Sequence, residues 1–239
     1  METNTNQNKT LKSFFKKTGL IFLFSALLLL NEGCQSKPAN HNLIMQDEIR
    51  KSHAAEVLQG KSDRSDKNAG IVDFDGDEKL AQYIASYVRK MNSKIDAPKF
   101  TQTLMSLSQK HSYDPILILA IIQTESRFNF NAVGSAGEIG LMQIKPKTAE
   151  WICMKNNIKW KGAKALKNPE YNIVIGTAYI KYLKKTLNSK SLKYINAYNM
   201  GLASMKRSTN LKNHPYFPKV IGNYLSIYSK LNKIKVTAI

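Results

Sequence analysis

The chain has 239 residues, of which 43% are hydrophobic and 22% charged, an ordinary composition that leaves room for one substantial domain with accessory segments. Lys and Arg number 36 against 17 Asp and Glu, and the net charge of +19 favours a polyanionic partner such as nucleic acid, an anionic membrane or an acidic cell-wall polymer. The basic residues are spread along the chain without a zinc-finger or RNA-binding signature, so nucleic acid is the weaker interpretation and no nucleic-acid partner is expected.

The first thirty-three residues predict a signal peptide. An apolar run extends from Leu20 to Leu30 and is preceded by four basic residues, Lys9, Lys12, Lys16 and Lys17. As a helix this run rises only about 16 Å, too short for the roughly 30 Å hydrocarbon core of a bilayer. Residues 1–33 are therefore expected to direct export and to be removed.

A cysteine directly follows this segment. Gly33-Cys34 resembles a lipoprotein-processing site, although Asn31 and Glu32 depart from the usual aliphatic and small residues. We expect lipid on Cys34 and a periplasmic membrane lipoprotein, with the outer membrane favoured over a free periplasmic or secreted form. Cys153 is the other cysteine of the sequence, so a disulfide between the two is the alternative.

Residues 34–75 have the composition of a tether. They are rich in Ser, Lys, Asn, Asp and Gln and poor in aromatic residues, which disfavours independent folding. A short helix near residues 43–58 is compatible with this interpretation. The folded domain is predicted over residues 76–239.

Apolar residues in this domain recur at helical spacing. The sequence predicts helices from Glu78, after Asp96, at 116–124, from Asn168, at 192–198 and at 217–231. Strand-like alternation of useful length is missing from the sequence, so the predicted fold class is mainly α. Gly134, Gly137 and Gly140 cluster in the segment 127–145, which predicts a loop.

One carboxyl group, that of Glu125, lies at the predicted boundary between a buried helix and a loop. The helix 116–124 is apolar on nearly every face and must be buried, and Glu125 follows it directly, beside the glycine-rich loop. Desolvation at such a boundary raises the pKa of a glutamate and keeps it protonated near neutral pH, as a general acid requires. The alternative is a surface charge at a helix end.

Three separated elements sharpen this interpretation: Glu125-Ser126, then Gly140-Leu141-Met142-Gln143 with Pro146, and then Ala197-Tyr198-Asn199-Met200-Gly201. In this order and spacing they resemble the catalytic domain of the soluble-type (SLT) lytic transglycosylases, within the lysozyme-like superfamily. The similarity covers about residues 100–232. The segment 216–220 is similar to the family's closing Tyr-Val-x-x-Val element.

The resemblance implies a lysozyme-like domain that cleaves the bond between N-acetylmuramic acid and N-acetylglucosamine in peptidoglycan glycan strands and leaves 1,6-anhydro ends. It implies that Glu125 is the acid and base and that four residues line the sugar-binding groove: Met142, Gln143, Tyr198 and Asn199. Read without the resemblance, these four are core filler, a loop cap or a turn former. No cofactor is implied, and the four histidines show no metal-ligand spacing.

The chain departs from the family pattern at three positions. Gly134 stands where many members carry a serine, Met200 replaces a small residue, and Lys212 falls where soluble relatives often have a glutamate. The missing serine removes a hydrogen bond to substrate. The reaction class is unaffected, because Glu125 is present.

Two other functions stay open. A hydrolytic muramidase on the same fold usually needs a second carboxylate, for which Glu138 is nearest in sequence, although we expect it to face solvent. A non-catalytic wall-binding lipoprotein has no need of a desolvated acid. The sequence leaves the oligomeric state open.

Overall fold

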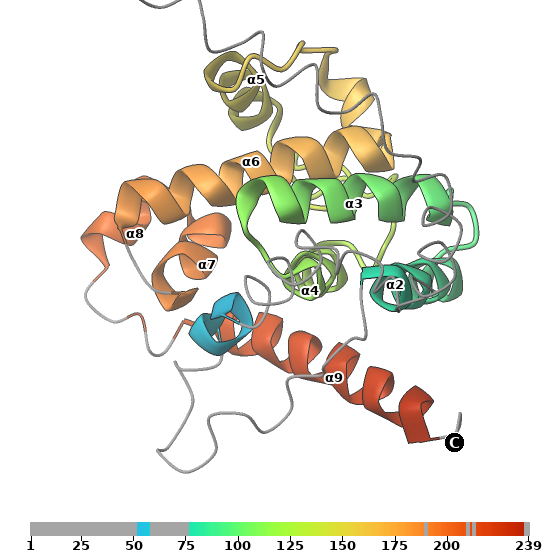
Figure 1. Cartoon of the computed structure of the whole chain (residues 1–239). Helices are drawn as coiled ribbons and strands as arrows, with labels where there is room; N and C mark the ends of the chain where they lie inside the picture. The colour runs from blue at the N-terminus through green and yellow to red at the C-terminus, as the bar shows by residue number, and fades with distance from the viewer. Residues whose placement is uncertain (1–51, 58–76, 189–190, 209–210, 212–213, 237–239) are drawn as a thin grey trace, which may run out of the picture. The chain divides into compact units, whose positions relative to one another are not determined.

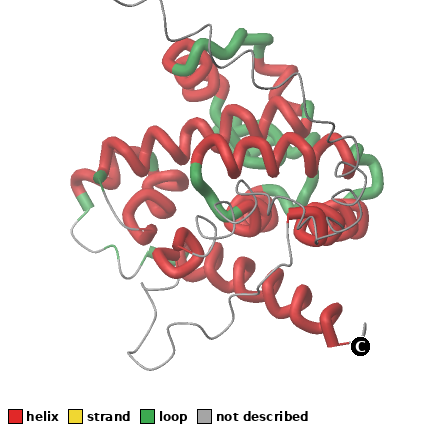
Figure 2. The backbone as a smooth tube through the Cα atoms, in the orientation of Figure 1, coloured by secondary structure: helices red, strands yellow, loops and turns green. Residues whose placement is uncertain are grey.

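The computed structural model of the chain describes residues 52–57, 77–188, 191–208, 211 and 214–236, all within the unit Asn40–Ile239. The predicted signal peptide, Cys34 and Lys212 lie outside these residues. The described segments form helices and loops and contain no strand (Figure 2). None of their helices combines the length and apolar composition needed to cross a membrane.

The described helices follow one another from α2 to α9 (Figure 1). Their bounds are α2 Asp77–Met91, α3 Ala97–His111, α4 Pro115–Glu125, α5 Pro146–Lys155, the short 3-10 helix η2 Ala163–Lys167, α6 Pro169–Leu187, α7 Ser191–Met200, α8 Leu202–Arg207 and α9 Tyr216–Val236. The six predicted helices are confirmed, with ends shifted by a few residues. Helices α5, η2 and α8 were not predicted.

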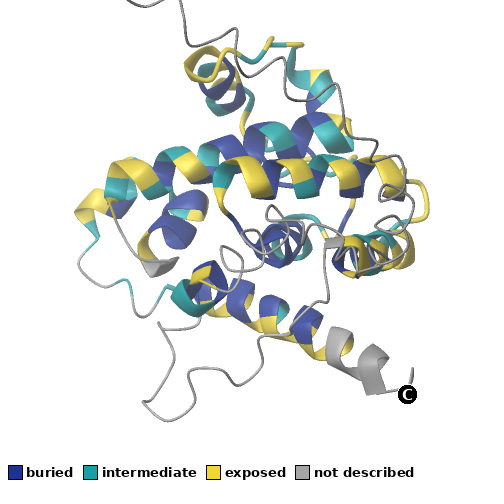
Figure 3. Cartoon of the chain, in the orientation of Figure 1, coloured by how far each residue is buried: buried dark blue, intermediate teal, exposed yellow. Residues whose placement is uncertain are grey.

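Helix α4 lies at the centre of the core. Every residue from Pro115 to Ile122 is buried, because the helix has no polar face to turn toward solvent (Figure 3). Its main partner is α9, and α3 contacts it as well. Asp114 caps its first turn by accepting a hydrogen bond of 2.9 Å from the backbone N–H of Ile116.

Helices α3 and α6 pack side by side over the central helix (Figure 1). Helix α6 also contacts α5, η2 and α7, so it connects the two ends of the domain. The Asn168 side chain caps α6 by accepting a bond of 2.8 Å from the N–H of Tyr171, and Pro169 is its first residue. The predicted mainly α fold class is confirmed.

Residues 52–57 lie within the predicted tether, in the part where a short helix was expected. They are helical, and Ala54 and Val57 are completely or almost completely buried in the domain core. The His53 ring accepts a bond of 3.0 Å from the N–H of Asp114 at Nδ1 and lies 3.0 Å from the Tyr194 hydroxyl at Nε2. Average composition hid these contacts, because polar residues outnumber the apolar ones between 34 and 75.

Candidate active site

Glu125 is the last residue of α4, at the point where the buried helix meets a cavity. The Tyr216 hydroxyl, at the start of α9, donates a hydrogen bond of 2.5 Å to Oε1 of this carboxyl. Burial raises the pKa of Glu125 to about 7, while the Tyr216 hydrogen bond and the nearby Lys219 charge lower it in part. Glu125 therefore holds a proton near neutral pH and can release it.

The contacts of the Ser126 hydroxyl explain why a serine follows Glu125 in the sequence. This hydroxyl lies 2.7 Å from the carbonyl of Leu141, to which it donates, and 3.3 Å from the carbonyl of Ile122. The first contact joins the end of α4 to the loop that carries Met142 and Gln143. A serine at this position thus fixes the distance between the acid and the opposite wall of the cavity.

The glycine-rich loop is held by its own backbone. Ile139 and Ile144 exchange two N–H to carbonyl bonds of 3.1 Å, and the N–H of Gly134 donates to the carbonyl of Glu138 at 2.8 Å. Gly140 has a φ of +83°, and a Cβ there would lie 2.2 Å from the carbonyl oxygen of Leu166. Only glycine satisfies both conditions.

Asn172 is a buried residue of α6 that ties this loop to the helix layer. Its Oδ1 accepts a bond of 2.8 Å from the N–H of Met142, and its Nδ2 donates to the carbonyls of Ile139 at 3.0 Å and Leu166 at 2.8 Å. Sequence reasoning missed this residue. The available signal was a single amide within the apolar stripe of α6.

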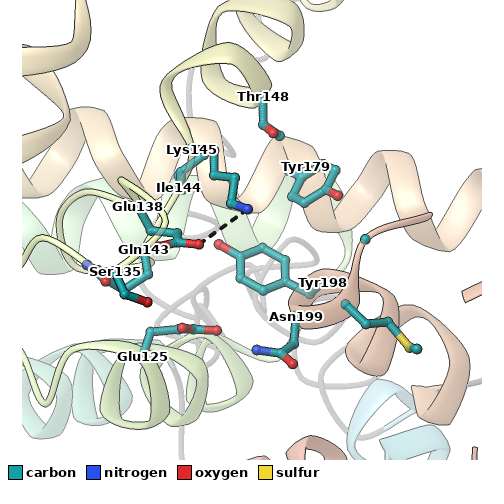
Figure 4. A pocket seen from close by; sticks show the side chains of 13 residues that line it. Glu125, Ser135, Glu138, Gln143, Ile144, Lys145, Thr148, Tyr179, Tyr198 and Asn199 are labelled. Atoms are coloured by element: carbon teal, nitrogen blue, oxygen red, sulfur yellow. Dashed lines mark ion pairs between the residues drawn. The ribbon is translucent and has the colours of Figure 1, made fainter. Parts of the chain in front are cut away.

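The cavity beside Glu125 has a volume of about 310 Å³ and is open to solvent. Figure 4 shows Glu125 on one side, the glycine-rich loop and the start of α5 on another, and the end of α7 on a third. The lining residues are Glu125, Gly134, Ser135, Glu138, Gln143, Ile144, Lys145, Thr148, Tyr179, Tyr198, Asn199, Met200 and Gly201.

Three of the four residues predicted to line a sugar groove are in this cavity. Gln143 lies on the loop wall, and Tyr198 and Asn199 lie on α7 (Figure 4). The Tyr198 hydroxyl donates a hydrogen bond of 2.7 Å to the carbonyl of Met142, and this bond holds the ring against the loop. Tyr179 packs on the same ring, with centroids 5.4 Å apart.

Met142, the fourth of these residues, lies in the core. Its side chain is fully buried, it does not line the cavity, and a Cβ on Gly176 of α6 would lie 2.3 Å from its sulfur. The prediction that Met142 lines the sugar groove therefore does not match its position. The residue packs the loop onto α6, and its backbone carbonyl orients Tyr198.

Glu138, which we expected to face solvent, lines the solvent-open cavity beside Glu125. Its Oε1 lies 3.5 Å from Nζ of Lys145, the ion pair drawn in Figure 4, and its Oε2 accepts a bond of 3.1 Å from the N–H of Ala136. Hydrogen bonds from its own backbone N–H and that of Ala136 lower the pKa of Glu138, with a further contribution from Lys145. The cavity thus holds one carboxyl group whose pKa is raised and one whose pKa is lowered.

Tyr216 was noted in the sequence only as part of a closing element and was not assigned to the site. The 2.5 Å bond to Glu125 makes it a direct partner of the acid. Among the described residues, no group of three His, Cys, Asp or Glu side chains is arranged to hold a metal ion. Cys153 is buried with a free thiol, 3.6 Å from the Tyr171 hydroxyl.

Comparison with known proteins identifies the domain. Residues 103–219 match the family model of the transglycosylase SLT domain. A membrane-bound lytic murein transglycosylase C of Sodalis glossinidius is 40% identical over 120 residues, covering 46% of this chain and 34% of that protein. Its Haemophilus influenzae counterpart is 33% identical over 135 residues, covering 53% and 38%. Residues 103–219 thus match the transglycosylase SLT domain, the family that the sequence motifs indicated.

Two solved structures are similar to the chain. An inactive mutant of the lytic transglycosylase Slt from Pseudomonas aeruginosa aligns with a TM-score of 0.49 at 24% identity, covering 65% of this chain and 31% of that one. The 70 kDa soluble lytic transglycosylase of Escherichia coli aligns with a TM-score of 0.45 at 21% identity, covering 64% and 30%. The matched region spans about a third of the relatives' own length.

Proposed function

We propose that the chain is a peptidoglycan lytic transglycosylase in which Glu125 acts as the single general acid and base. The observation that carries the proposal is the state of this carboxyl group. It is partly buried, its pKa is raised to about 7, and it lies in a cavity lined by Gln143, Tyr198 and Asn199. The SLT domain match and the names of the relatives support this reaction class.

The proposed reaction needs no water. Glu125 donates its proton to the glycosidic oxygen between N-acetylmuramic acid and N-acetylglucosamine, and the bond from that oxygen to the anomeric carbon breaks as positive charge develops on the carbon. The carboxylate then removes the proton from the muramic acid 6-hydroxyl, whose oxygen bonds to the anomeric carbon. Glu125 returns to its protonated form, and the product carries a 1,6-anhydro ring.

Substrate binding is assigned to the cavity walls. Gln143 and Asn199 provide amide groups for sugar hydroxyl and acetamido groups, and Tyr198 provides an aromatic surface. The Tyr198 hydroxyl already donates to Met142, so toward substrate it can only accept. The buried Met142 is left out of the binding set.

Digestion of purified sacculi, followed by mass spectrometry of the products, tests the proposal. Wild-type protein is expected to release anhydro-muropeptides, and Glu125→Gln is expected to lose about a hundredfold to ten-thousandfold in rate because an amide cannot transfer the proton. Glu150→Gln, on the exposed face of α5, is the matched control and should cleave normally. Reducing-end products would instead indicate a hydrolase, and a Glu125→Gln rate within tenfold of wild type would remove Glu125 from its role.

We further infer that the chain is exported, with residues 1–33 as signal peptide, and is anchored to a membrane through lipid on Cys34. The support is the cysteine after the apolar run and the membrane-bound naming of the relatives. Cys34→Ala should move the protein to the soluble fraction, because loss of the acyl chains removes the anchor. Cys153→Ala is the control and should stay with membranes. Unchanged fractionation of Cys34→Ala would contradict the anchor.

A further inference from the structure

Neighbouring side-chain atoms fill the space that a Cβ on Gly134 would need. The φ of Gly134 lies outside the left-handed region, so its backbone does not require a glycine. A Cβ at this position would lie 2.4 Å from Oε2 of Glu138 and 2.9 Å from Oε1 of Gln143. Two side-chain oxygens therefore occupy the room that any larger residue at position 134 would need.

The Glu138 carboxylate is fixed in this place. The N–H of Ala136 donates to Oε2 at 3.1 Å, and Nζ of Lys145 lies 3.5 Å from Oε1. The side chain is 24% exposed and lines the same cavity as Glu125. A carboxylate has about four acceptor positions, so acceptor capacity is left on the cavity side.

The side-chain oxygen of Gln143 also lies beside Gly134. Nε2 of Gln143 donates to the carbonyls of Ala132 at 3.3 Å and Gly140 at 2.9 Å, which uses both amide hydrogens. Oε1 is then turned toward Gly134, and no donor from the described part of the chain reaches it. Both acceptor oxygens thus lie next to the space that a Gly134 Cβ would occupy.

We propose that Glu138 and Gln143 form a two-acceptor site for a hydrogen-bond donor of the glycan, and that Gly134 makes room for it. Sugars of the cell wall offer such donors as acetamido N–H groups and hydroxyls. Glu138 is then a substrate-binding residue in place of a side chain at position 134. The inference rests on the proposed function, because it assigns a contact within the same cavity.

The test is a double-mutant cycle on steady-state cleavage. Glu138→Ala removes the acceptor and should raise KM about threefold to tenfold with little change in kcat, whereas Glu138→Gln keeps an acceptor oxygen and should recover part of the loss. Gly134→Ala should raise KM similarly, because its methyl group displaces the end of the flexible Glu138 side chain rather than backbone. The double variant should lose less than the sum of the two single losses, because both changes disturb the Glu138 contact, and the loss beyond Glu138→Ala comes from the Gln143 oxygen, 2.9 Å from the added Cβ.

Gly222→Ala on α9 is the matched glycine control, since a Cβ there meets nothing within 4 Å, and it should leave KM unchanged. Binding of tetra-N-acetylchitotetraose and of cellotetraose to Glu125→Gln protein, with and without Glu138→Ala, identifies the donor. Weaker binding of the acetylated sugar alone indicates an acetamido N–H, and equal weakening of both indicates a hydroxyl.

Three results would overturn the inference: unchanged KM in Glu138→Ala, additive losses in the double variant, or a shift in the ratio of anhydro to reducing ends on removal of Glu138. The last would make Glu138 a second catalytic carboxylate. None of these results affects the role of Glu125, which the Glu125→Gln experiment tests separately.

Discussion

The Tyr216 hydroxyl and the Glu125 carboxyl are joined by a hydrogen bond of 2.5 Å although they stand 91 positions apart in the sequence. The bond connects the start of α9 to the end of α4, the two helices that form the main packing contact around the central core. It stabilises the ionised carboxylate against the effect of burial, which raises the pKa. The proton affinity of the acid is thus set by a balance between a buried helix end and one phenol.

Tyr216→Phe tests this balance. Without the hydrogen bond the pKa of Glu125 rises, so the alkaline limb of the pH–rate profile should move to higher pH. The carboxyl also loses its fixed orientation, and kcat should fall by roughly tenfold to a hundredfold, the size expected for loss of a hydrogen bond to a charged group. Steady-state rates from pH 5 to 9 measure both effects, and a profile that coincides with that of wild type would separate Tyr216 from Glu125.

Cleavage by the wild-type protein should decline as pH rises through about 7. Glu125 must carry a proton to act as acid, and its pKa lies at about 7 because burial disfavours the charged form. The fitted alkaline pKa should disappear from the residual activity of Glu125→Gln. A constant rate between pH 6 and 9 would contradict the assignment.

The raised pKa of Glu125 also predicts that ionisation of this group lowers the free energy of unfolding. The folded-state pKa of Glu125 is raised above the value of 4.5 for an unperturbed glutamate, so the folded protein keeps a proton that the unfolded chain loses. Stability from this group is present below pH 4.5 and is lost as pH rises through about 7. Glu125→Gln should therefore be more stable than wild type by about 1 to 3 kcal/mol at pH 8, with the advantage shrinking toward pH 4.5. Urea denaturation at the two pH values measures the difference, and an advantage independent of pH would contradict the linkage.

Asn172→Ala should destabilise the domain by about 2 to 4 kcal/mol, because the N–H of Met142 and the carbonyls of Ile139 and Leu166 lose a buried partner. Asn156→Ala, at the exposed end of α5, removes one bond to the carbonyl of Ile152 and is the matched control, with a loss of about 0.5 kcal/mol. Chemical denaturation compares the two. Equal losses would show that the Asn172 contacts do not hold the loop.

His53→Ala should lower the free energy of unfolding at pH 7 by about 2 kcal/mol, although the residue precedes the matched SLT region by fifty positions. Burial, aided by the Lys184 charge, lowers the pKa of His53 to about 3, so the fold requires the neutral ring. Its stabilisation is present above pH 6.5 and is lost as pH falls toward 3, and the variant should lack this acid slope. Thermal unfolding between pH 4 and 7 checks it, and identical curves would place residues 52–57 outside the cooperative unit.

The helices were predictable because apolar spacing and Asx-Pro starts are local signals. The N-cap Asp114 and the apolar run that follows it gave α4, and with it the burial of Glu125, directly from the sequence. Helix α5 was missed because its start lacks a side-chain cap. The burial of residues 52–57 was not predicted, because a few buried contacts cannot be seen in an average over a polar segment.

In the site, motif order located Glu125, Gln143, Tyr198 and Asn199 but could not separate a side chain that faces the cavity from one that faces the core. The loop backbone makes that distinction, since Gln143 has a positive φ of 46° and turns toward the cavity, while Met142 turns toward Gly176. The Tyr216 contact depends on the ends of α4 and α9 meeting in space, and the position of Glu138 in the cavity depends on the conformation of the loop around it. They required the tertiary structure.

The burial of residues 52–57 also limits the length of chain between Cys34 and the folded domain. If the folded unit begins at this helix rather than at α2, a chain anchored at Cys34 has only residues 35–51 between lipid and domain. A fully extended chain covers about 3.3 to 3.6 Å per residue, so this segment spans at most about 60 Å. The cavity then reaches glycan strands no farther from the membrane than this length plus the dimensions of the domain itself, so the position at which one short helix docks limits the depth of wall open to cleavage.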